Sequence, residues 1–336
     1  MPDPGTASLI IGVDVGGTTT AAGAVTPTGT VILEESVPTH RHGPGRALDA
    51  IVPLIATVRE RAERSGHVIG GIGLGIPGPV DVASGRVGDP AHHVPELVGR
   101  ALGPELAARF GVPVFLDNDV NALALAEWRW GHGRGARSMV ALALGTGIGA
   151  GIILDGRLVR GAIGFGGELG HVPVNFEGPP CWCGSRGCLV VYASGRGIAA
   201  AARARVAPGS ALLRAAGGDP QAIAAEMVFA AAGEGDAVAA AVVEEACRAL
   251  GAMIGTIVNG LNPEVVVITG GVAGSLASLE ARVMKAAGEY AFAQALAVTK
   301  VLLVPGDKRV TMRGAAALVL HETDQSRSTD RKEEAR

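Results

Sequence analysis

Two segments of the chain share one pattern, and this repetition constrains the fold more than any other feature. An apolar strand at residues 9–15 ends in the glycine turn Gly16-Gly17-Thr18-Thr19, and the chain returns as a second strand. About 130 residues later, a strand at 139–144 ends in Gly145-Thr146-Gly147 and again returns as a strand. A unit that recurs along a chain indicates a repeated architecture. The sequence therefore predicts two related halves whose glycine turns face each other.

The remaining segments alternate between strand and helix patterns. Buried strands are expected at 69–76, 113–116 and 265–268. Helices are expected at 47–65, 96–110, 120–130, 195–207, 222–233, 237–258 and 314–321. Asn259-Gly260 is typical of a helix C-cap and marks the end of the helix at 237–258. This alternation predicts the α/β class.

A chain of 336 residues is long enough for two lobes. We expect an N-terminal lobe at 1–130 that is joined by a C-terminal helix at 314–322. A C-terminal lobe is expected at 131–313. Residues 323–336 are polar and charged, which predicts a disordered tail.

Both glycine turns offer successive backbone N–H groups with no side chain in the way, and such a concavity suits phosphate. Asp14 precedes the first turn, and its carboxylate could reach Mg²⁺ or the water around it. Thr18 and Thr146 add hydroxyl donors. Ordinary tight turns are the alternative, because the chain contains 51 glycines. Two turns with matching flanks favour phosphate binding.

Two other phosphate motifs can be tested against the sequence. The pattern G-x-x-x-x-G-K-[ST] is absent, which excludes a P-loop. Residues 145–150 match a loose dinucleotide fingerprint, but that fingerprint must open a helix. Here the chain continues as the strand Ile152-Ile153-Leu154, so a dehydrogenase is disfavoured.

Asp117-Asn118-Asp119 follows a strand and opens a helix. One of the two carboxylates is expected to be a simple N-cap. Asp119 is the candidate general base, and a weak base suffices for phosphoryl transfer, whose attacking hydroxyl loses its proton late. Together with Asn118, Glu168 and His171, it suits phosphoryl transfer to a small polyhydroxylated molecule.

Three of the four cysteines lie within eight residues, Cys181-Trp-Cys183-Gly-Ser-Arg-Gly-Cys188, and His171 stands ten residues upstream of Cys181. Three thiolates and one imidazole form a closed tetrahedral Zn²⁺ set, which is structural rather than catalytic. The alternative is a set of ordinary cysteines in a Gly-rich loop, where exposed thiols would be reactive. Cys247 lies in an Ala-rich run and is expected to fill the core.

Composition excludes several classes of protein. The net charge is −3 with 3% aromatic residues and no basic block, which argues against a nucleic-acid surface. No apolar run reaches the roughly 18 residues of a membrane span. The sequence from Met1 to Ser8 has no signal-peptide pattern. Clustered thiols without a signal suit a reducing cytoplasm, where we expect the protein to act.

These motifs resemble those of the bacterial ROK-type sugar kinases, the glucokinases in particular. The resemblance extends from about Leu9 to Leu320. Its specific motifs are Asp14-Val-Gly-Gly-Thr18, Leu144-Gly-Thr-Gly-Ile148, Asn118-Asp119, Glu168-Leu-Gly-His171 and the Cys-x-Cys-Gly-x-x-Gly-Cys loop.

The resemblance implies a two-lobed fold of the actin-like, ribonuclease-H-like ATPase type that closes over its substrates. It implies ATP with Mg²⁺ and transfer to the 6-hydroxyl of a hexose. Asp119 would be the base, while Asn118, Glu168, His171 and the backbone near Gly78 would contact the sugar. Gly270-Gly271 would contact adenosine. By analogy, a homodimer or homotetramer is expected.

One position departs from the family pattern. The cysteine loop normally closes as Gly-Cys-Leu-Glu, and the glutamate binds sugar hydroxyls near the anomeric end, but here Val190 takes its place. A hydrogen bond to a charged group contributes about 1.5–3 kcal/mol. The alternative substrate is therefore an amino sugar or a C7 cyclitol of the valiolone type. A standard glucokinase would instead need compensation by a neighbour such as Tyr192, or would have only modest activity on glucose.

Two non-enzymatic functions also have to be weighed. Repressors of this family carry a helix-turn-helix domain before the first phosphate turn, whereas only 13 residues precede Asp14 here. A sugar sensor without activity would not need Asp119. Polyphosphate as the donor would favour a basic stripe, which the sequence lacks.

Overall fold

The computed structural model describes residues 8–334, with side chains described as far as residue 326. The chain divides into two compact units. Unit 1 contains residues 1–135, 158–166 and 308–336, and unit 2 contains residues 136–157 and 167–307. The segment 158–166, which the sequence placed in the C-terminal lobe, therefore belongs with unit 1.

Unit 1 is built around a five-stranded sheet in the order β3-β2-β1-β4-β7. Strand β1 pairs antiparallel with β2 and parallel with β4, and β7 continues the parallel part. The strands and helices of unit 1 are β1 Leu9–Val15, β2 Thr19–Val25, β3 Val31–Pro38, α1 Ala47–Arg64, β4 Ile69–Ile76, β5 Val80–Asp81, β6 Arg86–Val87, the 3₁₀ turn η1 Pro95–Leu97, α2 Leu102–Phe110, β7 Val114–Asn118, α3 Asp119–Trp130 and α12 Val310–Glu334.

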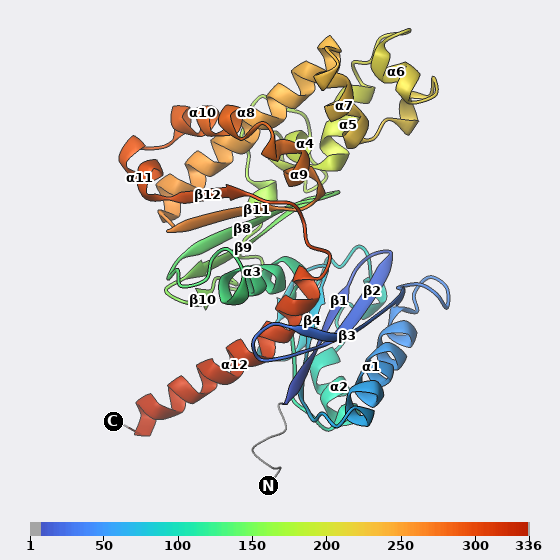
Figure 1. Ribbon diagram of the computed structural model, residues 1–336, viewed down its shortest axis with the longest axis vertical. Coiled ribbons are helices and arrows are strands. Elements are labelled where there is room, and N and C mark those ends of the chain that lie inside the picture. The colour runs from blue at the N-terminus through green and yellow to red at the C-terminus, as the bar shows by residue number, and fades with distance from the viewer. Residues whose placement is uncertain (1–7, 335–336) are drawn as a thin grey trace. The chain divides into compact units, whose positions relative to one another are not determined.

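The two faces of this sheet are covered by different helices. Figure 1 shows α1 and α2 on one face and α3 and α12 on the other. Alternate residues of β1 divide accordingly: Leu9, Ile11 and Val13 join the core with α1 and α2, while Ile10 packs with Ala316 of α12. Period-two burial of this kind is what an apolar strand between two layers of helix requires.

Glycines bring α12 into backbone contact with the sheet. A Cβ atom at Gly12 would collide with the carbonyl oxygen of Met312, and one at Gly73 would collide with that of Ala315. At Gly314, a Cβ atom would collide with the carbonyl oxygen of Ala122 in α3. These three positions allow the C-terminal helix to lie directly on β1, β4 and α3.

Unit 2 repeats the same sheet in the order β10-β9-β8-β11-β12. Strand β8 pairs antiparallel with β9 and parallel with β11, and β11 pairs parallel with β12. Its elements are β8 Met139–Leu144, β9 Ile148–Leu154, β10 Arg157–Leu158, η2 Leu169–His171, α4 Val190–Ala193, α5 Gly195–Arg203, α6 Ala211–Ala215, η3 Pro220–Ala222, α7 Ala225–Gly233, α8 Ala237–Leu261, β11 Val265–Thr269, α9 Gly271–Ala277, α10 Glu280–Tyr290, α11 Ala293–Val298 and β12 Lys300–Leu303. The equivalent strand order in both units confirms the predicted α/β class with duplicated halves.

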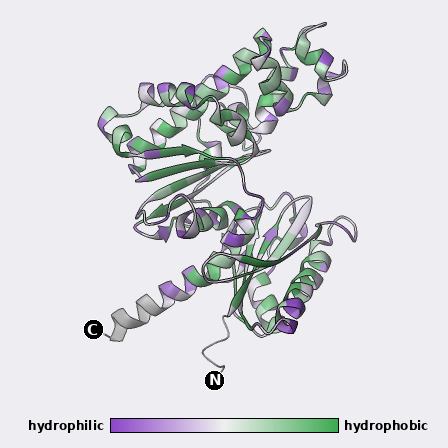
Figure 2. Ribbon diagram, viewed as in Figure 1, coloured by the Kyte–Doolittle hydropathy of each residue, from purple (hydrophilic) through white to green (hydrophobic). Residues whose placement is uncertain are grey.

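The buried helix of unit 2 is α8, which packs against α10 and α7. A Cβ atom at Gly251 or Gly255 would lie within 3.0 Å of atoms of α10, so these two glycines set the close approach of the helices. Figure 2 shows the strands of both sheets as predominantly hydrophobic, in keeping with their burial.

Several boundaries differ from the sequence predictions. The helix expected at 96–110 is interrupted, because Gly99 has a positive φ of 76° between η1 and α2. Helix α8 continues past Asn259-Gly260 to Leu261, and its left-handed C-cap is Asn262, with φ 42°. The edge strand β3 and the elements α9, α10 and β12 were not predicted.

The C-terminal helix is also longer than predicted. The sequence indicated a helix at 314–321 and a disordered tail at 323–336, whereas α12 continues to Glu334. Residues 335 and 336 lie outside the described residues.

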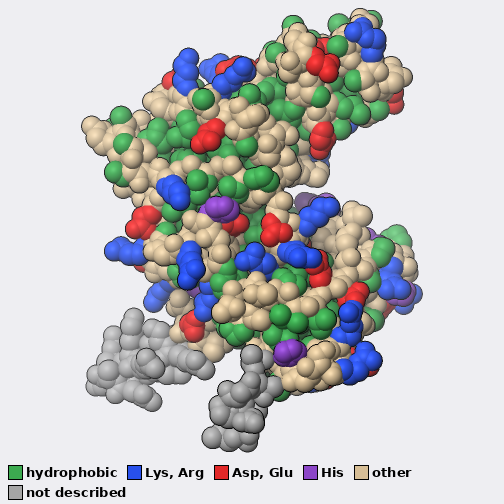
Figure 3. Space-filling model, in the orientation of Figure 1, with side chains coloured by type: hydrophobic (Ala, Val, Ile, Leu, Met, Phe, Trp, Pro, Cys, Tyr) green, Lys and Arg blue, Asp and Glu red, His purple; other side chains and the backbone are tan. Residues whose placement is uncertain are grey.

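The surface is mixed in charge, and the described helices do not span a membrane. On the face drawn in Figure 3, acidic and basic side chains are intermingled. Among the described residues, none of the helices combines the length and the hydropathy that crossing a bilayer would require.

Candidate functional site

The first glycine turn joins β1 to β2 in unit 1. The amide of Gly16 donates to the carbonyl oxygen of Thr19 at 3.1 Å, which closes the turn. The Thr39 hydroxyl donates to the Gly16 carbonyl at 2.6 Å and also lies 2.9 Å from the buried Thr20 hydroxyl. A Cβ atom at Gly17 would lie 2.7 Å from the His93 ring. Thr39 and His93 therefore pack against one side of the turn, whereas Thr18 and Thr19 are exposed to solvent.

Asp14 lies near the end of β1, and only Val15 separates it from the glycine turn. Its carboxylate is half-buried, and this burial raises the pKa of Asp14 to about 6. A carboxylate that is partly removed from water favours a neighbouring cation, because the cation restores the stability of the ionised form. Asp14 is thus the residue of this turn that would hold Mg²⁺ or its water shell.

Asn118 caps helix α3, although the sequence pattern pointed to one of the neighbouring aspartates as the cap. Its side-chain oxygen accepts from the amides of Val120 at 2.8 Å and Asn121 at 3.3 Å. Its side-chain nitrogen donates to the carbonyl oxygen of Gly78 at 3.2 Å. The amide can do both because it carries an acceptor and two donors, whereas a carboxylate only accepts. Gly78, Asn118 and Asp119 therefore meet in unit 1.

Asp117 has a structural role that the sequence did not indicate. It is buried, and its Oδ1 accepts from the amide of Asn118 at 2.7 Å and from Nδ2 of Asn121 at 2.8 Å. Its Oδ2 accepts from Nε of Arg160 at 2.6 Å, and Nη2 of Arg160 donates to Glu322 of α12 at 2.5 Å. A buried carboxylate needs such partners.

Asp119 is the first residue of α3 and follows this network directly. Its Oδ1 accepts from the amide of Val120 at 2.9 Å. Gly75 of β4 lies under it, where a Cβ atom would come within 3.2 Å of the Asp119 Cα. The positive end of the helix dipole favours the ionised carboxylate.

The second glycine turn lies in unit 2 and opens onto a pocket of about 500 Å³. The Gly145 amide donates to the Gly147 carbonyl at 2.9 Å, and the Gly145 carbonyl accepts from the Gly195 amide at 2.8 Å. The pocket is lined by Gly145, Thr146, Gly195, Arg196, Ala199, Arg203, Ala224, Ala225, Glu226, Gly271 and Val272. Of the predicted phosphate and adenosine residues of this unit, Gly145, Thr146 and Gly271 line this cavity, whereas Gly147 and Gly270 do not.

Gly270 shapes the same region through close packing. It has φ 112°, and a Cβ atom there would collide with the carbonyl oxygen of Leu144. A Cβ atom at Gly306 would in turn lie 2.9 Å from the Gly270 Cα. Only glycine allows strands β8 and β11 to end this close to the start of α9.

His171, Cys181, Cys183 and Cys188 form one cluster, with ligand atoms within 4.8 Å of one another. Nδ1 of His171 lies 3.5 Å from Cys181 Sγ, and the Sγ atoms of Cys183 and Cys188 are 3.8 Å apart. A tetrahedron with Zn–S of about 2.3 Å and Zn–N of about 2.0–2.1 Å has edges of about 3.5–3.8 Å. The donor set and its spacing fit a structural Zn²⁺.

The Cys188 thiol of this cluster needs a cation to be stable as a thiolate. Burial, followed by the neighbouring Cys181 and Cys183 thiols, raises the pKa of Cys188 to about 12. A dication reverses this preference by stabilising the charged form. Use of Nδ1 by the cluster would leave Nε2 of His171 as the nitrogen available to a sugar.

Glu168 and His171 share the short turn η2, whose closing bond runs from the His171 amide to the Glu168 carbonyl at 3.0 Å. The Glu168 side chain is exposed and has no protein partner among the described residues. Val190, in contrast, is 0% exposed and begins α4. The Tyr192 hydroxyl accepts from Asn175 Nδ2 at 3.0 Å and keeps its own hydrogen for another acceptor, so compensation by this neighbour stays a prediction.

The cysteine loop Cys181–Cys188, named the zinc loop below after the ion expected there, makes a contact that was not apparent from the sequence. Trp182 lies edge-on to His171, with ring centroids 5.4 Å apart. The guanidinium carbon of Arg196 lies 3.6 Å from the centroid of the Trp182 ring, a cation–π contact. Arg196 lines the pocket of the second turn, so the zinc loop supports a cation at that pocket.

Known proteins share the sequence pattern and the fold of this chain. The sequence model that describes the ROK family matches residues 10–322 of this chain. The chain belongs to the ROK family. This confirms the resemblance drawn from the glycine turns and the cysteine loop, and the solved members confirm the two-lobed actin-like ATPase fold.

Three relatives illustrate the range of the family. A glucokinase from Thermotoga maritima is 34% identical, over 92% of this chain and 96% of its own length. A ROK family glucokinase from Streptomyces griseus, solved with glucose and AMPPNP, is 32% identical with a TM-score of 0.75, covering 93% of this chain and 99% of that one. A ROK family transcriptional regulator, a homolog of the E. coli MLC protein, is 30% identical with a TM-score of 0.81, covering 94% and 78% respectively.

We expect one zinc per chain, held by the four-residue cluster. Cys183→Ser should lose this zinc, because a hydroxyl is a poor substitute for a thiolate ligand. The measurement is metal analysis of the purified protein after dialysis. Cys247→Ala, which changes the cysteine outside the cluster, is the matched control and should keep its zinc. Wild-type protein without metal, with its thiols intact, would contradict the assignment.

We also expect Arg196 to contribute to nucleotide binding through its support by Trp182. A charge-assisted hydrogen bond contributes about 1.5–3 kcal/mol, so Arg196→Ala should raise the Kd for ADP roughly 10- to 100-fold. Trp182→Ala should raise it only a few-fold, as expected for a cation–π contact. Calorimetric titration with ADP measures both.

Trp182→Phe retains an aromatic face and is the matched control. Its Kd should stay close to that of the wild type, with zinc content unchanged. An Arg196→Ala variant that binds ADP as tightly as the wild type would refute this role.

Proposed function

We propose that this chain is an ATP-dependent sugar kinase that phosphorylates the primary 6-hydroxyl of a hexose, with Asp119 as general base. The glucokinase relatives and the ROK glucokinase structures support phosphorylation of a sugar. The observation that carries the proposal is the start of helix α3. There Asn118 is fixed by its cap and by Gly78, and Asp119 follows on a helix whose first turn is braced through Asp117.

Each unit has a defined part in this proposal. Unit 1 provides the first phosphate turn with Asp14, the sugar contacts Gly78 and Asn118, and the base. Unit 2 provides the nucleotide pocket and the sugar ligands Glu168 and His171. Mg²⁺ would neutralise charge on the transferred phosphoryl group. Asp119 accepts the proton of the attacking hydroxyl as the oxygen–phosphorus bond forms and the bond to ADP breaks.

A sugar-responsive regulator is the contrasting class, since a ROK family transcriptional regulator shares the fold. Two observations favour the kinase. Asp119 is retained in a braced position, and the glucokinase relative is matched over 96% of its length. A chain that only senses sugar needs the sugar contacts but has no use for a general base.

The second candidate is a specialised kinase that acts on an amino sugar or a C7 cyclitol of the valiolone type. Val190 favours it, because the family resemblance implies a sugar-binding glutamate at this position, whereas this chain has the buried Val190. A ligand whose hydroxyl is missing, inverted or replaced at that end would lose nothing from the exchange. Glucose would lose one charge-assisted hydrogen bond.

Asp119→Asn should abolish most of the turnover, because general-base catalysis contributes about 10²- to 10⁴-fold. An ADP-release assay with saturating sugar and ATP measures the loss. Zinc content and circular dichroism should be unchanged. The exposed carboxylate of Asp81 in unit 1 gives the matched control Asp81→Asn, which should retain activity. Full turnover by Asp119→Asn would contradict the mechanism.

The acceptor is decided by kcat/KM over glucose, mannose, 2- and 3-amino sugars, N-acetyl sugars and valiolone-type cyclitols. A clear lead for glucose supports the first candidate, and a lead for an amino sugar or cyclitol supports the second. Val190→Glu should raise the preference for glucose about 10- to 100-fold by restoring a charged hydrogen bond. Val190→Leu controls for the added volume, and equal effects of both variants would contradict the role of Val190.

A further inference from the structure

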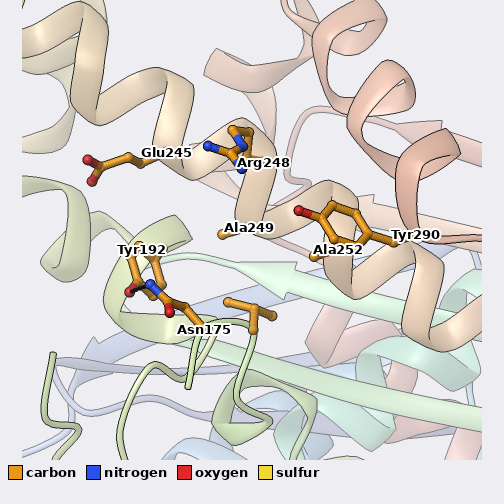
Figure 4. Close-up of a pocket in the computed structure, with 8 residues that line it drawn as sticks. Asn175, Tyr192, Glu245, Arg248, Ala249, Ala252 and Tyr290 are labelled. Carbon is orange, nitrogen blue, oxygen red and sulfur yellow. Dashed lines mark hydrogen bonds between the residues drawn. The ribbon is translucent and has the colours of Figure 1, made fainter. Parts of the chain in front are cut away.

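A second cavity of unit 2 is separate from the residues assigned above. It has a volume of about 310 Å³ and lies among helix α8, the segment after η2, helix α4 and the end of α10. Figure 4 shows Asn175, Tyr192, Glu245, Arg248 and Tyr290 around it. The small side chains of Ala249 and Ala252 on α8 leave the space open.

Arg248 is the available charge of this cavity. Its side chain is exposed and has no hydrogen bond or ion pair to the residues that the structure describes. Glu245, one turn earlier on α8, is already paired, because Nη1 of Arg205 donates to its Oε1 at 2.7 Å. The positive charges of Arg205 and Arg248 are therefore balanced by only the one negative charge of Glu245. A planar guanidinium with unused donors is suited to a phosphate or a carboxylate.

Tyr192 adds a donor with a fixed direction. Its oxygen accepts from Asn175 Nδ2 at 3.0 Å, so the hydroxyl hydrogen remains for another acceptor. Asn175 is itself held by the cysteine loop and by a local turn, since its amide donates to the Gly187 carbonyl at 3.3 Å and its side-chain oxygen accepts from the amide of Glu177 at 3.0 Å.

Tyr290 forms the opposite wall and is also held in place. A Cβ atom at Gly255 of α8 would lie 2.7 Å from the Tyr290 Cβ, so the two backbones are in close contact there. Nδ2 of Asn259 donates to the Tyr290 carbonyl at 2.8 Å. The residue is 45% exposed. An exposed, anchored aromatic face is suited to a ring-shaped ligand with apolar C–H edges.

We propose that this cavity binds a phosphorylated monosaccharide, with the phosphate on Arg248 and the Tyr192 hydroxyl and the sugar ring beside Tyr290. The donors of Arg248 and Tyr192 suit an anionic group, and the aromatic ring of Tyr290 suits a ring-shaped ligand. Glu245 retains a second carboxylate oxygen as an acceptor for sugar hydroxyls. The identity of the ligand rests on the proposed function, because a hexose phosphate is the product class of that reaction.

The test is calorimetric titration of the zinc-loaded protein with glucose 6-phosphate, in the presence of saturating glucose and AMPPNP. These two occupy the sites of the proposed reaction, so further binding reports the second cavity. Arg248→Met should weaken it about 10- to 100-fold, the loss expected for charge-assisted hydrogen bonds. Tyr290→Ala should weaken it several-fold. Arg282→Met removes a nearby cation that does not line the cavity and should bind as the wild type does.

Three results would overturn the proposal. They are the absence of further binding, equal binding by the wild type and Arg248→Met, and binding of inorganic phosphate or of the uncharged sugar as tight as that of glucose 6-phosphate. Loss of the kinase assignment is a separate outcome, because it is decided by turnover of wild-type and Asp119→Asn protein. Arg248→Met should keep its initial rate of ADP release.

Discussion

The backbone contact between α12 and the first sheet is the constraint on which unit 1 depends. Gly12, Gly73 and Gly314 remove the Cβ atoms that would keep α12 away from β1, β4 and α3. Because α12 lies this close, Glu322 reaches Arg160, and Arg160 holds the buried Asp117. The position of the proposed base, two residues later, thus depends on glycines far away in the sequence. An added methyl group at any of the three would shift the helix that closes this network.

The two halves share a sheet order but support their glycine turns differently. The first turn is held by the hydroxyl of Thr39, the residue that follows the antiparallel edge strand β3. The second is held by Gly195, whose amide meets the Gly145 carbonyl, and it opens onto a cavity beside α5 and α9. Duplication therefore provides two similar turns, and the helices added to unit 2 turn one of them into a nucleotide-sized pocket. The asymmetry follows from α4 to α7, which have no counterpart among the described elements of unit 1.

Features set by neighbouring residues could be predicted from the sequence. Both hairpins, the cysteine cluster and the start of α3 depend on residues within a few positions of each other. Features that depend on distant partners could not. Asn118 rather than an aspartate is the cap because Gly78 offers its amide an acceptor. Arg160 joins unit 1 through Asp117. The extension of α12 beyond His321 likewise has no apolar pattern that would reveal it.

The zinc loop links three features of unit 2 that the sequence treats separately. His171 is both a ligand of the cluster and a neighbour of Trp182, and Trp182 supports Arg196 at the nucleotide pocket. Asn175 and Tyr192 each lie four residues beyond a ligand, His171 and Cys188, and form the wall of the second cavity. A loop rich in glycine and proline has little secondary structure to fix such side chains. A closed metal site would replace that missing scaffold, because its ligands lose their freedom together when the ion binds. Zinc would thus affect substrate binding by positioning residues that are not themselves ligands of the zinc.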